Sequence, residues 1–116
     1  FLFRLMAVVN QYKFAGLNAN TDNTEKNPFG SSNPLVSETY LIKSIIVKSA
    51  GTPTPTVTND GIVVIQSAAL VANQSKELLT QPLIVEGGKT LTIKAGSADA
   101  FTFGVSYLNI KKEVTT

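Results

Sequence analysis

The chain contains no cysteine, no histidine and no tryptophan in 116 residues. Without cysteine, no disulfide framework can hold the fold together, although its absence does not identify the cellular compartment. Without cysteine and histidine, the usual ligands of zinc sites are missing. Without histidine, a nucleophilic serine, threonine or lysine also lacks its commonest general base. The missing residue types therefore argue against most hydrolytic and metal chemistry.

The acidic residues that remain are poorly grouped for catalysis. Most of the eight carboxylates lie in predicted turns and loops, and a glycosidase would need two of them on opposite sides of a cleft. Residues 18–23 superficially resemble a calcium loop, but they lack the glycine and the final bidentate glutamate of an EF-hand. We therefore expect no enzyme activity, no metal and no other cofactor.

Long apolar runs and clusters of one charge are also missing. The longest apolar run is too short to cross a membrane, and the apolar start at residues 1–9 is too short for a signal peptide. Nine lysines and one arginine face eight acids, and the lysines are scattered, whereas nucleic-acid surfaces cluster them. We expect neither a membrane nor a nucleic-acid partner. Met6 leaves two origins open, a native start at Met6 or cleavage of a precursor before Phe1.

What the chain does contain is β-strand sequence, with thirteen threonines and eleven valines. Asn59-Asp60-Gly61 is the strongest hairpin signal, and residues 86–89 form a second predicted turn. Around them the pattern predicts strands at residues 1–14, 38–49, 62–65, 82–85, 90–94 and 101–110. Residues 67–72 are alanine-rich, and residues 75–80 are equally ambiguous between helix and strand. Both segments are short and uncapped, which favours strand and loop over helix.

Two of these strands carry further information. Residues 38–49 place apolar side chains at both parities, which predicts a strand that is central or covered on both faces. Phe101, Phe103, Val105 and Tyr107 alternate with small polar residues, after which Leu108 and Ile110 change the parity. A bulge or a change of packing partner near Tyr107 would produce that shift.

Residues 15–34 interrupt the strand pattern. They include five asparagines, two glycines and two prolines, which should end any strand and exclude a helix. Such a segment is either an arm that orders against a neighbour or a surface loop of the same domain. Exposed aromatic residues in a polar arm commonly anchor it in a partner's pocket, whereas Phe29 could equally hold the loop on its own domain.

Together these features predict an all-β protein, a β-sandwich of jelly-roll or immunoglobulin-like type with an extended N-terminal arm. Immunoglobulin hallmarks are missing, because there is no cysteine pair and no tryptophan. We expect residues 1–34 to form the N-terminal strand and arm and residues 35–116 to form the sandwich. The predicted partner-binding residues of the arm are Leu2, Phe3, Phe14, Asn18, Asn20, Phe29 and Pro34.

The region between Tyr40 and Ile110 resembles small β-sandwich virion proteins of tailed bacteriophages, of the marine type. The resemblance is carried by residues 40–49, 77–79, 82–95, 97–101 and 105–110. Such proteins decorate phage heads, collars or tails, and no catalytic residues are carried over from them. The resemblance implies that the chain is located in the virion, as a decoration or cement protein or as a neck or tail accessory. It also implies partners among other virion proteins, either the major capsid protein or neck and tail proteins.

We therefore predict a non-enzymatic capsid decoration or cement protein, a homo-oligomer that stabilises a phage head through many individually weak contacts. Two alternatives stay open. One is a tail, collar or fibre component that could bind host glycan. The other is a carbohydrate-binding accessory domain.

Overall fold

The computed structural model describes residues 5–20, 23–29 and 34–115, and the side chains of residues 10–17, 23–29 and 34–111. This part of the chain forms strands and no helix, so the all-β prediction is confirmed. The strands are β1 (Leu5–Asn20), β2 (Glu38–Ser49), β3 (Thr56–Asn59), β4 (Ile62–Gln66), β5 (Lys76–Glu77), β6 (Leu83–Val85), β7 (Leu91–Lys94) and β8 (Phe101–Thr115).

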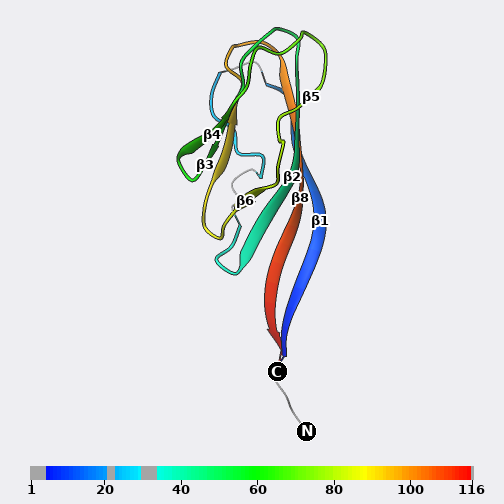
Figure 1. Ribbon diagram of the computed structural model, residues 1–116, viewed down its shortest axis with the longest axis vertical. Helices are drawn as coiled ribbons and strands as arrows, with labels where there is room; N and C mark the ends of the chain where they lie inside the picture. Colours follow the sequence, from blue (N-terminus) through cyan, green and yellow to red (C-terminus); the bar gives the residue numbers. More distant parts are fainter. Residues whose placement is uncertain (1–4, 21–22, 30–33, 116) are drawn as a thin grey trace.

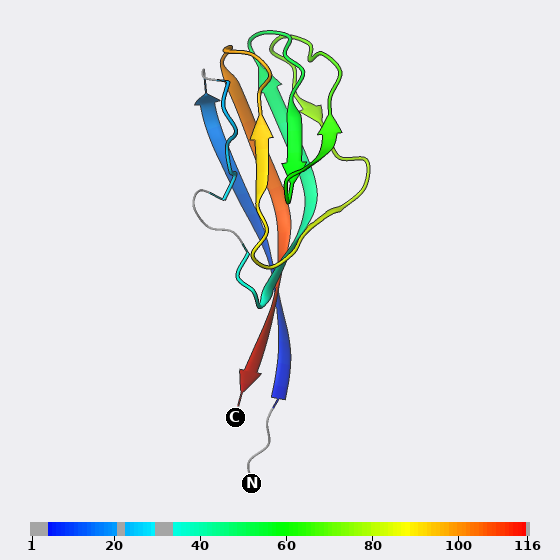
Figure 2. The same cartoon turned by 90° about the vertical axis from the view of Figure 1, so that its left-hand side faces the viewer.

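The strands form two antiparallel sheets that pack face to face as a β-sandwich. The larger sheet has the order β1-β8-β2, and the short strands β5 and β6 both pair with the far side of β2. The smaller sheet has the order β4-β3-β7. Figure 1 shows the sandwich from its edge, and Figure 2 shows the smaller sheet in front of the larger one. Within the smaller sheet, backbone hydrogen bonds between Lys26 and Ile93 cover the outer side of β7.

The core lies between the two sheets and is built mainly from alternate residues of the strands. Phe101, Phe103, Val105 and Tyr107 of β8 are all buried, which confirms the predicted inward face of this strand. Opposite them, the smaller sheet contributes the buried side chains of Val57, Leu91 and Ile93. Burying such apolar surface supplies the main favourable free energy of folding in a domain without disulfides.

A β-bulge in β2 explains why that strand is apolar at both parities. Ile42 pairs with Tyr107 and Ser44 with Ser106, so Lys43 is an extra residue in the ladder. Ile42 before the bulge and Ile45 after it are therefore both fully buried, although they differ in parity. The prediction that β2 is central is confirmed. Its mixed parity comes from the bulge, because Ile46 is 47% exposed on the outer face.

The bulge predicted in β8 near Tyr107 was assigned to the wrong strand. The bulge lies beside Tyr107, as the sequence indicates, but it belongs to β2. In β8 the alternation continues without interruption, and Asn109 takes the next buried position. The buried Asn109 side chain donates a hydrogen bond from Nδ2 to Glu38 Oε2 over 3.0 Å.

The first strand is longer than predicted, because β1 continues through residues 15–20. The prediction that residues 15–20 break the strand was wrong. Gly16 pairs with Gly104, and Leu17 pairs with Phe103 in β8. Backbone pairing with β8 outweighs the weak local preference of these residues, since strand formation depends strongly on the partner strand. The proposed division of the chain at residue 34 stays a prediction.

Both predicted turns are present. Asp60 and Gly61 have φ angles of 53° and 77°, which is the left-handed pair that a two-residue hairpin turn requires. Residues 86–89 also form a turn, closed by a hydrogen bond from the Lys89 amide to the Glu86 carbonyl over 3.0 Å. This second turn joins β6 and β7 of different sheets, so it is a connection between the two layers.

Candidate interaction surfaces

The free side of β1 forms one margin of the larger sheet. β1 pairs with β8 on one side, and it is the last strand in the sheet order. Thirteen successive residues, 5–17, pair one to one with β8. Tyr12 and Phe14 are 78% and 71% exposed on this strand, and Leu17 is 39% exposed. Among the described residues, no strand pairs with the other side of β1, so β1 offers backbone groups beside exposed apolar side chains.

The Phe14 ring lies against Gly104 on the outer face of the larger sheet. A Cβ at residue 104 would lie 2.7 Å from ring carbons of Phe14, so any other residue there would require the ring to move. Next to the ring, Ile46 is also exposed. A shallow groove of about 270 Å³ follows this face, lined by Phe14, Ile46, Val47, Lys48, Ser75, Thr102, Phe103 and Gly104.

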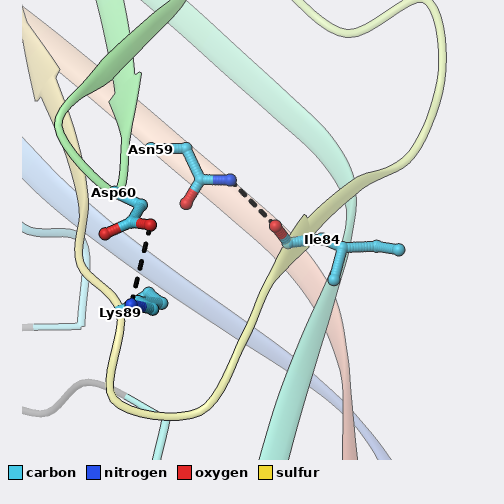
Figure 3. Close-up of polar contacts among 4 residues, drawn as sticks. All are labelled: Asn59, Asp60, Ile84 and Lys89. Carbon is cyan, nitrogen blue, oxygen red and sulfur yellow. Dashed lines mark hydrogen bonds and ion pairs between the residues drawn. The ribbon is translucent and has the colours of Figure 1, made fainter.

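The opposite margin of the sandwich is apolar too, but the structure closes part of it. Here β4 of the smaller sheet faces β6 of the larger one, and Ile62 and Ile84 are 64% and 53% exposed. Asn59 Nδ2 donates a hydrogen bond to the Ile84 carbonyl over 2.8 Å, which links the two sheets (Figure 3). Nearby, Lys89 Nζ lies 3.7 Å from Asp60 Oδ2. The hydrogen bond from Asn59 occupies the backbone carbonyl of Ile84 in β6. Of the described strands at this margin, β4 is the one whose outer side has no partner strand.

A cluster of three aromatic rings ties the segment before β2 to the body. The Phe29 ring packs edge-on against Tyr40 and Tyr107, with centroid distances of 4.8 Å and 4.9 Å. Burial, and to a smaller degree the nearby charge of Glu38, raises the pKa of both tyrosine hydroxyls. This cluster answers the question left open for Phe29, since its side chain packs on its own domain.

Two of the described carboxylates, those of Glu38 and Glu77, accept structural hydrogen bonds. Glu38 accepts hydrogen bonds from the Asn109 side chain and from the Leu35 amide, which lower the pKa of its carboxyl group. The Glu77 carboxylate accepts hydrogen bonds from the Ser44 hydroxyl and from the amides of Ile45 and Leu79. Among the described residues, no group of three or more acidic residues could hold a metal ion. Nor do they form a helix with the length and apolar character needed to cross a membrane.

The predicted arm residues fall in three different settings. Phe14 is exposed on β1, whereas Phe29 is partly buried and Pro34 fully buried. Asn18 and Asn20 belong to the backbone of β1, and their side chains lie outside the described set, as do Leu2 and Phe3 entirely. Of the predicted arm residues whose side chains are described, Phe14 is therefore the one that is largely exposed to a partner. The binding role of the set stays a prediction.

Sequence reasoning missed the exposed residues Leu17, Ile46, Ile62, Val64 and Ile84. Apolar runs such as residues 62–65 are typical of buried strands, and only the position at a sheet margin makes them exposed. Tyr12 carried a usable signal, because it stands beside a polar, asparagine-rich segment.

Comparison with known proteins identifies the fold. No family model matches the chain, and none of the curated proteins matches it. A chain from work on Bacillus endospore appendages, which form a novel family of disulfide-linked pili, aligns with a TM-score of 0.55 and 18% identity over 92% of this chain and 89% of that chain. A chain of the acidic stable capsid structure of Helicobacter pylori bacteriophage KHP30 aligns with a TM-score of 0.51 and 10% identity over 97% and 99%. At these identities the likeness establishes a shared fold only.

Proposed function

We propose that this chain is a non-enzymatic structural protein of a phage virion, a decoration or cement protein that stabilises a capsid. The observation that carries the proposal is the long free margin of β1 with exposed Tyr12 and Phe14. A surface of this kind serves binding to other protein subunits. The occupied hydrogen bonds of Glu38 and Glu77 fit a role in structure better than one in catalysis.

Two further observations support assembly on a virus particle. The sequence of residues 40–110 resembles small virion proteins of tailed phages, and one of the solved structures that share the fold is a phage capsid structure. A small decorating subunit does not need strong single contacts, because many copies on one particle add their contacts together.

Purified particles provide the test. Quantitative mass spectrometry with labelled peptides would count copies of the chain per particle, and thermal melting would compare particles with and without it. A decoration or cement protein should be present in many copies, and its removal should lower the temperature at which the shell opens. Absence of the chain from the particles would overturn the proposal.

A tail, collar or fibre component is the second candidate, and the shape of the molecule favours it. The chain measures 63 Å by 22 Å by 22 Å, and the other solved structure that shares its fold comes from pili. Those pili are disulfide-linked, whereas these 116 residues contain no cysteine and would have to join by non-covalent contacts. A low copy number would favour this candidate, and binding on a host glycan array would support the glycan-binding version. The carbohydrate-binding accessory domain stays a prediction that the same array would test.

A further inference from the structure

The margin of β1 lacks most of the features that keep sheet edges from pairing. Proteins protect such edges with short strands, bulges, prolines and charged side chains. Residues 5–17 of β1 run without a bulge and without proline, and Lys13 is their only charged residue. By contrast, β4 has five residues, and its register with β3 shifts after Val57.

At the start of β1 the larger sheet consists of only two strands among the described residues. Residues 5–8 pair with residues 112–115 of β8, whereas the pairing of β2 with β8 reaches only Lys111. The two strands therefore extend beyond the sandwich as a ribbon (Figures 1 and 2). A two-stranded ribbon is marginally stable alone, and residues 5–8 of this ribbon are all apolar by sequence. The same strand carries exposed Tyr12, Phe14 and Leu17 further along, beside the sandwich.

We propose that two copies of this chain pair antiparallel along their β1 margins, around a two-fold axis at Gln11. Residues 14–17 of each copy would then lie beside residues 5–8 of the other copy and become the third strand that its two-stranded ribbon lacks. This joins the two larger sheets into one sheet across the dimer, with the sandwiches at opposite ends. Symmetric pairing of one surface with itself is the commonest form of dimer.

The sequence of β1 selects this register. With Gln11 on the axis, the whole regular stretch of residues 5–17 overlaps with its copy. Leu17 then lies opposite Leu5 of the other copy, and Phe14 lies opposite Val8. Lys13 lies opposite Val9, whereas an axis at Lys13 would set two like charges directly opposite each other, which is unfavourable. An axis further along β1 would leave part of the apolar start uncovered.

The available surface is large enough for a specific contact. Tyr12 and Phe14 from two copies are mostly exposed, and aromatic side chains bury about 150–250 Å² each. Pairing at the margin would cover part of this surface against the neighbouring side chains of the other copy, towards the roughly 1,000 Å² that a specific interface requires. Two strands of thirteen residues supply the remaining area and the backbone hydrogen bonds.

Introduced cysteines test the register in the 116-residue chain, because it has no native cysteine to compete. We expect Gln11→Cys to form a disulfide-linked dimer on mild oxidation, visible on a non-reducing gel. Lys13→Cys is the matched control. In this register the two residues 13 are four positions apart along the strands, roughly 13 Å, beyond the roughly 7 Å that a disulfide spans between Cα atoms. Cross-linking through Lys13→Cys but not through Gln11→Cys would overturn the proposal.

Sedimentation velocity over a range of concentrations tests the surface independently of the cysteines. We expect the unmodified chain to show a monomer–dimer equilibrium and Phe14→Asp to weaken it about tenfold or more. The control is Val71→Asp, since Val71 is 60% exposed outside β1. Circular dichroism would verify that both variants are folded. A chain that stays monomeric, or a dimer unaffected by Phe14→Asp, would refute β1 pairing.

This pairing is a property of the purified chain and does not rest on the virion proposal. Failure of the dimer would leave the copy count on particles unchanged as a test. Absence of the chain from particles would likewise leave the cross-linking result valid.

Discussion

Replacement of Glu77 should destabilise the fold, although this residue lies at the surface in a strand of two residues. The β2 bulge interrupts the ladder on the β5–β6 side, where β6 pairs with β2 up to Ile42 and β5 pairs from Ile46. In the gap, Glu77 Oε2 accepts a hydrogen bond from the Ile45 amide over 2.7 Å. The carboxylate thus takes the place of a missing backbone partner.

The size of the effect follows from the burial of the groups involved. The Ser44 hydroxyl and the Leu79 amide are exposed enough for water to replace Glu77, whereas the Ile45 amide is partly buried. Leaving a buried donor without a partner, or losing a hydrogen bond to a charged group, costs about 1–3 kcal/mol. We expect Glu77→Ala to lower the free energy of unfolding by about 2 kcal/mol, with a fall in Tm of roughly 8 °C.

Urea denaturation followed by circular dichroism would measure this loss. Glu86→Ala is the control, because Glu86 is exposed at a turn and its loss should change the stability by less than about 0.5 kcal/mol. Glu77→Gln keeps one carbonyl acceptor for the Ile45 amide and should lose less than Glu77→Ala. If Glu77→Ala were as stable as Glu86→Ala, the carboxylate could not be the partner that completes the ladder at the bulge.

Three further predictions concern the core and the titrating groups. Ile45→Ala should cost about 2–5 kcal/mol and Ile46→Ala less than about 1 kcal/mol in the same denaturation assay; equal losses would contradict the assigned bulge, since only Ile45 is fully buried. Hydrogen bonds lower the pKa of the Glu38 carboxyl group below its ordinary 4.5 in the folded state. The ionised carboxylate therefore stabilises the fold above pH 4.5, and this stabilisation is lost as the pH falls through the lowered pKa. Unfolding measured from pH 7 down to pH 2 should therefore depend less on pH in Glu38→Gln; identical curves would contradict this. Because burial raises the pKa of Tyr107 above 10.0, the folded state keeps that proton longer, so stability should fall as the pH rises through 10 towards the raised pKa. Tyr107→Phe should fall less steeply there, and an unchanged slope would count against the assignment.

The features that followed from the sequence depend on near neighbours in the chain or on composition alone. The turn at Asp60-Gly61 could be predicted because a tight hairpin turn needs positive φ angles, which these residue types adopt most readily. The inward face of β8 could be predicted because Phe101, Phe103, Val105 and Tyr107 follow the period of two that any strand imposes. Composition also limited which kinds of site could be considered, because the 116 residues contain no histidine and no cysteine.

The candidate surface was only partly predictable. Phe14 was selected for its place beside a polar segment, and the structure leaves it exposed. Phe29 was selected for the same reason, but it packs against Tyr40 of β2 and against Tyr107, which lies far from it in the chain. The two phenylalanines have similar local sequence contexts, so local context alone cannot separate them.

The sequence by itself determined the strand class, the tight turns and the inward period of β8, because each is set by residues next to one another. Only the tertiary structure decided that β1 continues to Asn20, that the bulge belongs to β2, and that β1 is the free margin of the larger sheet. The physical reason is that a strand's length, register and exposure depend on the strand paired with it. For β1 that partner is β8, whose paired residues lie between 81 and 110 positions further along the chain.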